Sequence, residues 1–192
     1  MSGLTPVVPA QLLTNISKLP KIKLRENTSW SCEHELKRWC GECACTVNGV
    51  WKAPLRDALN FLADVIDLES ERMITRMGLD FQNVRNDYSS VLIGTESARE
   101  FALRHLGNSS EDTIRSFETL MTVQYERQRM FTSCGWFFDD FDRIEPKNNL
   151  RYASRAVRLF DKLTGTNLHA EMRERLRSVS DARTGLSADQ VI

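Results

Sequence analysis

The stretch from Thr28 to Cys45 constrains the fold more than any other part of this sequence, and it reads T-S-W-S-C-E-H-E-L-K-R-W-C-G-E-C-A-C. Its eighteen residues contain four of the five cysteines, one of the three histidines and two of the four tryptophans. Helix packing alone does not require thiols, an imidazole and indoles side by side. We therefore expect an irregular turn that forms a local site, with the rest of the chain as its scaffold.

Five side chains of this stretch are soft metal ligands: Cys32, His34, Cys40, Cys43 and Cys45. Four of them could complete a tetrahedral zinc site. Paired zinc ligands are usually two to four residues apart, which suits Cys40 with Cys43 better than Cys43 with Cys45. The alternative is that the cysteines are free and pack as small apolar side chains.

The tryptophans of the stretch suggest a second kind of site. Trp30 and Trp39 lie nine residues apart. An indole face can stack on the apolar C–H surface of a sugar ring, while its N–H can reach a hydroxyl group. The alternative is ordinary burial in a core.

Two catalytic alternatives have less support from the sequence. Cys32 or Cys134 could pair with His34 as nucleophile and base, but no third, orienting residue is evident. The acidic cluster that follows Phe138 could supply paired carboxylates for glycoside chemistry, although such a run after a helix is usually a solvated face. That cluster consists of Asp139, Asp140, Asp142 and Glu145.

Charge and cysteine usage narrow the classes of partner. The chain has 26 basic and 26 acidic side chains and a pI near 6.8, which argues against nucleic acid and anionic membranes as partners. It contains no apolar run of the roughly 18 residues that span a bilayer. Pro6 and Pro9 interrupt the amino terminus, which does not resemble a secretory signal. With an odd number of cysteines, we expect reduced thiols and a cytoplasmic location.

Apolar periodicity predicts a single helical domain. Lys21 to Arg25 alternates apolar and cationic residues and predicts a short strand without a partner in the chain. The sequence indicates an all-α bundle of four to six helices, preceded by this strand and the Cys/Trp-rich turn. The expected parts are an extended lead-in (1–20), the helical domain (21–178) and a flexible tail (179–192); the expected helices run from Pro54 to Gly78, from Asp80 to Ile93, from Glu96 to Leu106, from Ser110 to about Gly135, and after a turn near Pro146 to Gly165.

Three blocks of sequence resemble a known family. They are the Thr28–Cys45 stretch, W-K-A-P-L-R-D-A-L-N-F-L, and M-F-T-S-C-G-W-F-F-D-D-F followed by R-Y-A-S-R-A-V-R-L. Together they are similar to domain of unknown function 3536, which is found at the carboxyl end of proteins like glycoside hydrolase family 57. The resemblance covers Lys21 to about Leu163.

The resemblance implies an architecture in which an α/β barrel carries the catalytic carboxylates and an all-α carboxyl-terminal domain covers its mouth. Lys21 to Arg25 would then be the last barrel strand. By likeness to related branching enzymes, Trp30 and Trp39 would contact an α-glucan, with His34 and Arg38 as polar neighbours. No catalytic residue is expected, because the barrel's motifs are absent from this sequence.

This chain departs from the family pattern around the cysteines. It has Glu33-His34-Glu35 where the family commonly has Pro-His-Gly, and Cys43-Ala44-Cys45 where the family usually has Cys-Gly-Cys. Cys40 occupies a position that is usually charged or polar in the family, which makes it a weaker metal ligand.

Two hypotheses follow for the function. In the first, the chain is a non-catalytic domain that completes the glucan cleft of a separate or lost catalytic barrel, with no cofactor expected. In the second, it is a helical interaction module without a sugar role, stabilised by zinc on Cys32, His34, Cys43 and Cys45.

Overall fold

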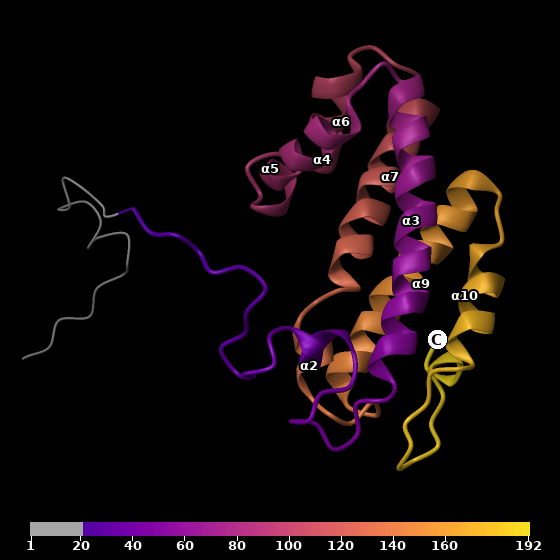
Figure 1. Ribbon diagram of the computed structural model, residues 1–192. Helices are drawn as coiled ribbons and strands as arrows, with labels where there is room; N and C mark the ends of the chain where they lie inside the picture. Colours follow the sequence, from indigo (N-terminus) through magenta and orange to yellow (C-terminus); the bar gives the residue numbers. More distant parts are fainter. Residues whose placement is uncertain (1–20) are drawn as a thin grey trace, which may run out of the picture.

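The computed structural model describes residues 21–192, and helices make up the regular structure of that part of the chain (Figure 1). The predicted all-α class is thus confirmed, while the predicted lead-in (1–20) lies outside the described residues. The helices are α2 (Lys37–Cys40), α3 (Lys52–Arg76), α4 (Phe81–Asp87), α5 (Ser89–Leu92), α6 (Ala98–Leu106), α7 (Glu111–Arg129), α8 (Cys134–Phe137), α9 (Ile144–Thr164), α10 (Leu168–Leu176) and the 3-10 turn η1 (Ala188–Gln190).

Helix α3 is the longest element and follows the predicted pattern closely. Pro54 lies in its first turn, where the missing N–H removes no helical hydrogen bond. Leu55, Leu59 and Leu62 of its apolar stripe have no exposed surface. The chain leaves the helix at Gly78, whose φ of 77° lies in the left-handed region that glycine favours.

The main core lies between α3, α7, α9 and α10, which run side by side in the body of the molecule (Figure 1). Leu150, Ala153, Val157 and Phe160 on one face of α9 are fully or almost fully buried. Burying each large apolar side chain contributes about 1.5–3 kcal/mol. This core is therefore a large source of stability for the bundle, and it does not include the cysteine cluster.

A second core lies at the far end of α3, where α6 packs against α7 and α4 packs against α3 (Figure 1). Phe101 of α6 stacks on Phe117 of α7, with ring centroids 5.8 Å apart. Side-chain caps begin α6 at Ser97 and α7 at Ser110. The Ser110 cap confirms the start predicted for the long helix.

The described structure has no strand at Lys21–Arg25, where the sequence predicted one. This segment has no regular structure, and Ile22 and Leu24 are 79% and 77% exposed. Alternation of apolar and polar residues produces a strand only when a neighbouring strand accepts its hydrogen bonds. Within residues 21–192 the structure holds no sheet that could do so.

Two helix boundaries differ from the prediction around the α7–α9 connection. Helix α7 ends at Arg129 rather than near Gly135, which instead lies buried in the short helix α8. Pro146 does not mark a turn but sits in the first turn of α9, where proline is tolerated.

The carboxyl-terminal segment, for which the sequence predicted a flexible tail (179–192), has several residues packed against the bundle. Val179, Asp181 and Ala188 have no exposed surface. The buried carboxylate of Asp181 accepts hydrogen bonds from the backbone N–H groups of Phe141, Arg183 and Thr184. The polar composition of the segment therefore reflects an internal hydrogen-bond network as well as a solvated face. None of the described helices has the length and apolar character of a membrane span.

Candidate metal centre and aromatic pocket

The four ligands singled out by the sequence meet at one point beside α2. Cys32 Sγ lies 3.5 Å from Cys43 Sγ and 3.7 Å from Cys45 Sγ. His34 Nδ1 lies 3.1 Å from Cys45 Sγ, 3.4 Å from Cys43 Sγ and 3.7 Å from Cys32 Sγ. All four ligand atoms lie within 4.8 Å of one another, so the cluster could hold a metal ion.

These distances fit a tetrahedron of the size that zinc requires. With Zn–S bonds of about 2.3 Å and a Zn–N bond of about 2.05 Å, the edges would be about 3.8 Å between sulfurs and about 3.5 Å between sulfur and nitrogen. The five distances given above fall within a few tenths of an ångström of these edges. They are also far longer than a disulfide bond, and all the cysteines are free.

Local turns explain why residues of such close spacing can share one ion. The backbone N–H of Thr46 donates to the carbonyl oxygen of Cys43 over 2.9 Å, and the Thr46 hydroxyl donates to the same oxygen over 2.8 Å. This turn brings Cys43 and Cys45 to the same cluster. The expectation that Cys40 with Cys43 would be the better pair is wrong, because Cys40 ends α2 and belongs to the aromatic pocket instead.

Hydrogen bonds within the cluster affect its two later thiols in opposite directions. The backbone N–H of Cys45 is the main cause that lowers the pKa of Cys43. Hydrogen bonds to the thiols of Cys32 and Cys43 raise the pKa of Cys45 to about 11. Neighbouring thiols cannot all ionise unless a cation compensates their charge, and a soft divalent metal supplies that charge.

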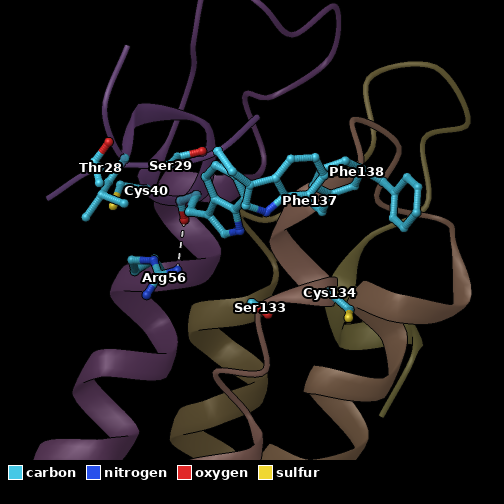
Figure 2. Close-up of a pocket in the computed structure, with 11 residues that line it drawn as sticks. Thr28, Ser29, Cys40, Arg56, Ser133, Cys134, Phe137 and Phe138 are labelled. Atoms are coloured by element: carbon cyan, nitrogen blue, oxygen red, sulfur yellow. Dashed lines mark hydrogen bonds between the residues drawn. The ribbon is translucent and has the colours of Figure 1, made fainter. Parts of the chain in front are cut away.

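An open pocket of about 660 Å³ adjoins the Cys40 end of α2. Figure 2 shows Thr28 and Cys40 on one side of it, Phe137 and Phe138 on the other, and Arg56 below. The residues that line it are Thr28, Ser29, Trp30, Leu36, Trp39, Cys40, Arg56, Ser133, Cys134, Phe137 and Phe138. Four of these eleven residues are aromatic, and Leu36 and two cysteines add further apolar surface.

The two tryptophans predicted to contact a ligand both line this pocket. The Trp30 ring is 89% exposed and lies nearly parallel to Phe137, with centroids 6.0 Å apart and an angle of 16° between the planes. Trp39 is half-buried and meets the same Phe137 at 6.2 Å and 55°. Phe137 thus joins the two indoles into one aromatic surface.

Polar contacts attach α2 to the bundle beneath the pocket. Arg38 Nε donates to the carbonyl oxygen of Phe137 over 2.9 Å, and its guanidinium pairs with Asp139 at 3.5 Å. Arg56 donates to the carbonyl oxygen of Trp39 over 2.8 Å, the contact drawn in Figure 2. Lys52, which is fully buried, donates to the carbonyl oxygen of Arg38 over 3.0 Å.

The structure separates the four residues that the resemblance assigned to glucan contact. Trp30 and Trp39 line the pocket, whereas His34 belongs to the metal cluster and Arg38 faces Phe137 and Asp139. Sequence reasoning missed Phe137, although the aromatic run W-F-F before the acidic cluster offered a signal for it.

The other catalytic alternatives are occupied by structural contacts. Asp139 pairs with Arg38, Asp140 and Asp142 both face Arg183, and Glu145 pairs with Arg143. These carboxylates are therefore engaged in ion pairs on the molecular surface.

Cys32 lies within reach of His34, but as part of the four-ligand cluster rather than as an isolated pair. Cys134, the other thiol considered, is exposed and lines the aromatic pocket.

The fold and the site together define a class: a helical bundle that carries a Cys/His cluster and an aromatic pocket at one end. The family model described as Domain of unknown function (DUF3536) matches residues 48–186, and the chain therefore belongs to this family. No curated protein and no solved structure matches the chain. The four metal-ligand candidates and both pocket tryptophans precede the matched residues, whereas Phe137 lies within them.

Proposed function

We propose that this chain is a non-catalytic helical domain that supplies the aromatic wall of an α-glucan cleft, as the carboxyl-terminal domain of a glycoside hydrolase family 57-like enzyme. The single observation that carries the proposal is the exposed Trp30 and the half-buried Trp39, joined by Phe137 at the edge of an open pocket. Flat rings exposed to solvent are the groups on which sugar rings stack, at about 0.5–1.5 kcal/mol per aromatic contact.

The proposed partner is a catalytic α/β barrel that would complete the cleft. The exposed segment Lys21–Arg25 supports this, because its alternating pattern suits a strand that pairs with a sheet outside the described residues. The carboxylates nearest the pocket are held in ion pairs, so we assign glycoside chemistry to the barrel and none to this chain. The balanced charge supports a neutral ligand rather than nucleic acid or a membrane, and the free thiols support a cytoplasmic location.

The four tryptophans allow this proposal to be tested within one molecule. Trp30 and Trp39 line the pocket, whereas Trp51 and Trp136 are each 1% exposed in the core. Titration with maltoheptaose, followed by the indole N–H signals in a proton–nitrogen NMR spectrum, should shift the first two signals and leave the other two unchanged. Trp30→Phe and Trp39→Phe variants assign the pocket signals.

The matched control replaces a partly exposed aromatic residue outside the pocket. Tyr125 of α7 is 36% exposed and does not line the pocket. Trp30→Ala should weaken maltoheptaose binding about 2- to 13-fold, as expected from the loss of one stacking contact, whereas Tyr125→Ala should not. If all four indole signals are insensitive to the sugar, with and without a barrel partner, the glucan proposal fails.

A second candidate function is a zinc-stabilised helical interaction module without a sugar role. The observation that favours it is the compact set of Cys32, His34, Cys43 and Cys45, whose spacing suits zinc. Removal of zinc with a chelator distinguishes the two candidate functions. Loss of the whole helical circular dichroism signal on zinc removal supports the module, whereas retention supports the first proposal, because the main core does not include the cluster.

A further inference from the structure

We infer that one Zn²⁺ ion bound by Cys32, His34, Cys43 and Cys45 holds Trp30 against Phe137, so that metal occupancy determines whether the outer wall of the aromatic pocket forms. The effect of zinc on glucan binding rests on the proposed function; the effect on Trp30 does not.

The ligands bracket the short helix that faces the pocket. His34 lies three residues before α2, and Cys43 lies three residues after it. Helix α2 has only four residues, none of them buried, and no side-chain cap. A single turn of this kind is unstable in isolation. An ion that joins its two flanks would tie the segment before α2, which carries Trp30, to the segment that follows α2.

Trp30 and Trp39 differ in the contacts that hold them apart from the metal cluster. The backbone around Trp39 is attached to α3 through Arg56, which donates to the Trp39 carbonyl oxygen, and through Lys52, which donates to the Arg38 carbonyl oxygen. These bonds do not involve the cluster. The Trp39 side of the pocket should therefore persist without metal.

Trp30 depends on the cluster much more directly. It lies two residues before Cys32, whose sulfur is 3.5 Å and 3.7 Å from those of Cys43 and Cys45. Its ring is 89% exposed and meets the bundle at Phe137 with a loose centroid separation of 6.0 Å. One exposed aromatic contact is worth about 0.5–1.5 kcal/mol, which is too little to order an entire segment against the entropy of about 1–2 kcal/mol per residue. The metal linkage through Cys32 supplies the missing constraint.

The coordination chemistry favours zinc over the hard ions magnesium and calcium. Three thiolates and one imidazole are soft ligands that suit zinc in tetrahedral geometry and do not suit magnesium or calcium. On binding, the thiols release protons to solvent and the ion takes four protein ligands, which leaves no open position. The site is therefore structural rather than catalytic.

The test uses the full chain, purified under reducing conditions and reconstituted with Zn²⁺. Elemental analysis should find about one zinc per chain, and replacement with Co²⁺ should give the intense visible absorption of a tetrahedral thiolate site. Cys45→Ser should lower zinc affinity by more than about 100-fold, since even outer-shell changes reduce metal affinity 10- to 100-fold. Cys40→Ser is the matched control, because Cys40 is equally an exposed cysteine of the stretch but lies outside the cluster.

The decisive readout is the indole signal of Trp30 after zinc is removed with a chelator. It should move to the position of an unstructured indole, and amide exchange should accelerate over residues 28–34, while the Trp39, Trp51 and Trp136 signals stay in place. Absence of bound zinc, occupancy by a different metal, or a Trp30 signal that is indifferent to zinc would each overturn the inference. A Trp30 signal that responds to zinc but not to maltoheptaose would retain the inference and reject the glucan function.

Discussion

The side-chain nitrogen of Lys52 lies fully buried at the start of α3 and donates a 3.0 Å hydrogen bond to the carbonyl oxygen of Arg38. Lys52 therefore connects the bundle to the segment that carries the candidate site. Burial lowers the pKa of Lys52 to about 8, opposed by the nearby carboxylate of Asp139.

This pKa predicts a specific dependence of stability on pH. Between about pH 8 and pH 10.5 the unfolded chain keeps the Lys52 proton that the folded chain has released, so the free energy of unfolding rises with pH across that window. The contribution of Lys52 to the free energy of unfolding should reach about 3 kcal/mol. Urea unfolding at several pH values should show this rise in the wild type relative to Lys52→Met, which removes the titrating group. Parallel pH profiles for the two proteins would contradict the prediction.

Glu35→Gly should stabilise the turn before α2. Glu35 has a φ of 60°, in the left-handed region where a side chain costs about 1–2 kcal/mol. This is the position at which the family resemblance leads us to expect glycine. We expect an increase of about 1 kcal/mol in the stability of the segment, visible as slower amide exchange over residues 32–45.

Glu33→Gly is the matched control for this prediction. Glu33 is also an exposed glutamate beside His34, but it is not among the described residues with positive φ. Glycine there should increase the freedom of the unfolded chain and give faster exchange. Equal effects of the two substitutions would show that the conformation of Glu35 is not the cause.

Gly135→Ala should destabilise the connection between α8 and α9. A Cβ atom at Gly135 would overlap the side-chain nitrogen of Asn149, which donates to the carbonyl oxygen of Thr132 over 3.1 Å. The side chain of Asn149 must move and lose this bond, at a cost of about 1–3 kcal/mol. Gly41→Ala, whose Cβ would meet Ala53 at an ordinary 3.6 Å, should have little effect. Thermal unfolding of both variants measures the difference.

Asp181→Asn should release the carboxyl-terminal segment from the bundle. Burial acts to raise the pKa of Asp181, but backbone N–H groups of Thr184, Arg183 and Phe141 lower it overall. The stabilisation that Asp181 contributes is thus fully present above the usual pKa of an aspartate, and it is lost as the pH falls through the lowered pKa of Asp181 in the folded chain. We expect a loss of about 1–3 kcal/mol at neutral pH.

Limited proteolysis after residue 178, together with urea unfolding, measures this effect. Asp64→Asn on the exposed face of α3 is the control and should behave like the wild type. If Asp181→Asn leaves the segment equally protected from protease, its hydrogen bonds do not hold it in place.

The helices could be predicted because their signals are local. The apolar stripe of α3, the serine that caps α7 and the glycine that ends α9 each act within a few residues. The Lys21–Arg25 pattern gave a wrong prediction of a strand for the opposite reason, since a strand requires hydrogen-bond partners that lie elsewhere. The packing of the polar tail was not predicted, because the sequence does not reveal that backbone N–H groups donate hydrogen bonds to Asp181.

The candidate site was partly predictable for similar reasons. The metal-ligand candidates lie close together in the chain, and the structure brings Cys32, His34, Cys43 and Cys45 together as the sequence suggested. Phe137 approaches Trp30 from more than a hundred residues away in the chain. Nothing in the local pattern around either residue specifies that approach.

Helix α3 begins beside the aromatic pocket and ends in the second core, and its 25 residues place these two regions about 37 Å apart. A change of shape or sequence in α4–α6 can reach the pocket through α3 and α7, the two long helices that connect these regions. Evolution could therefore change α4–α6 and the second core to suit different neighbours while the aromatic pocket stayed the same.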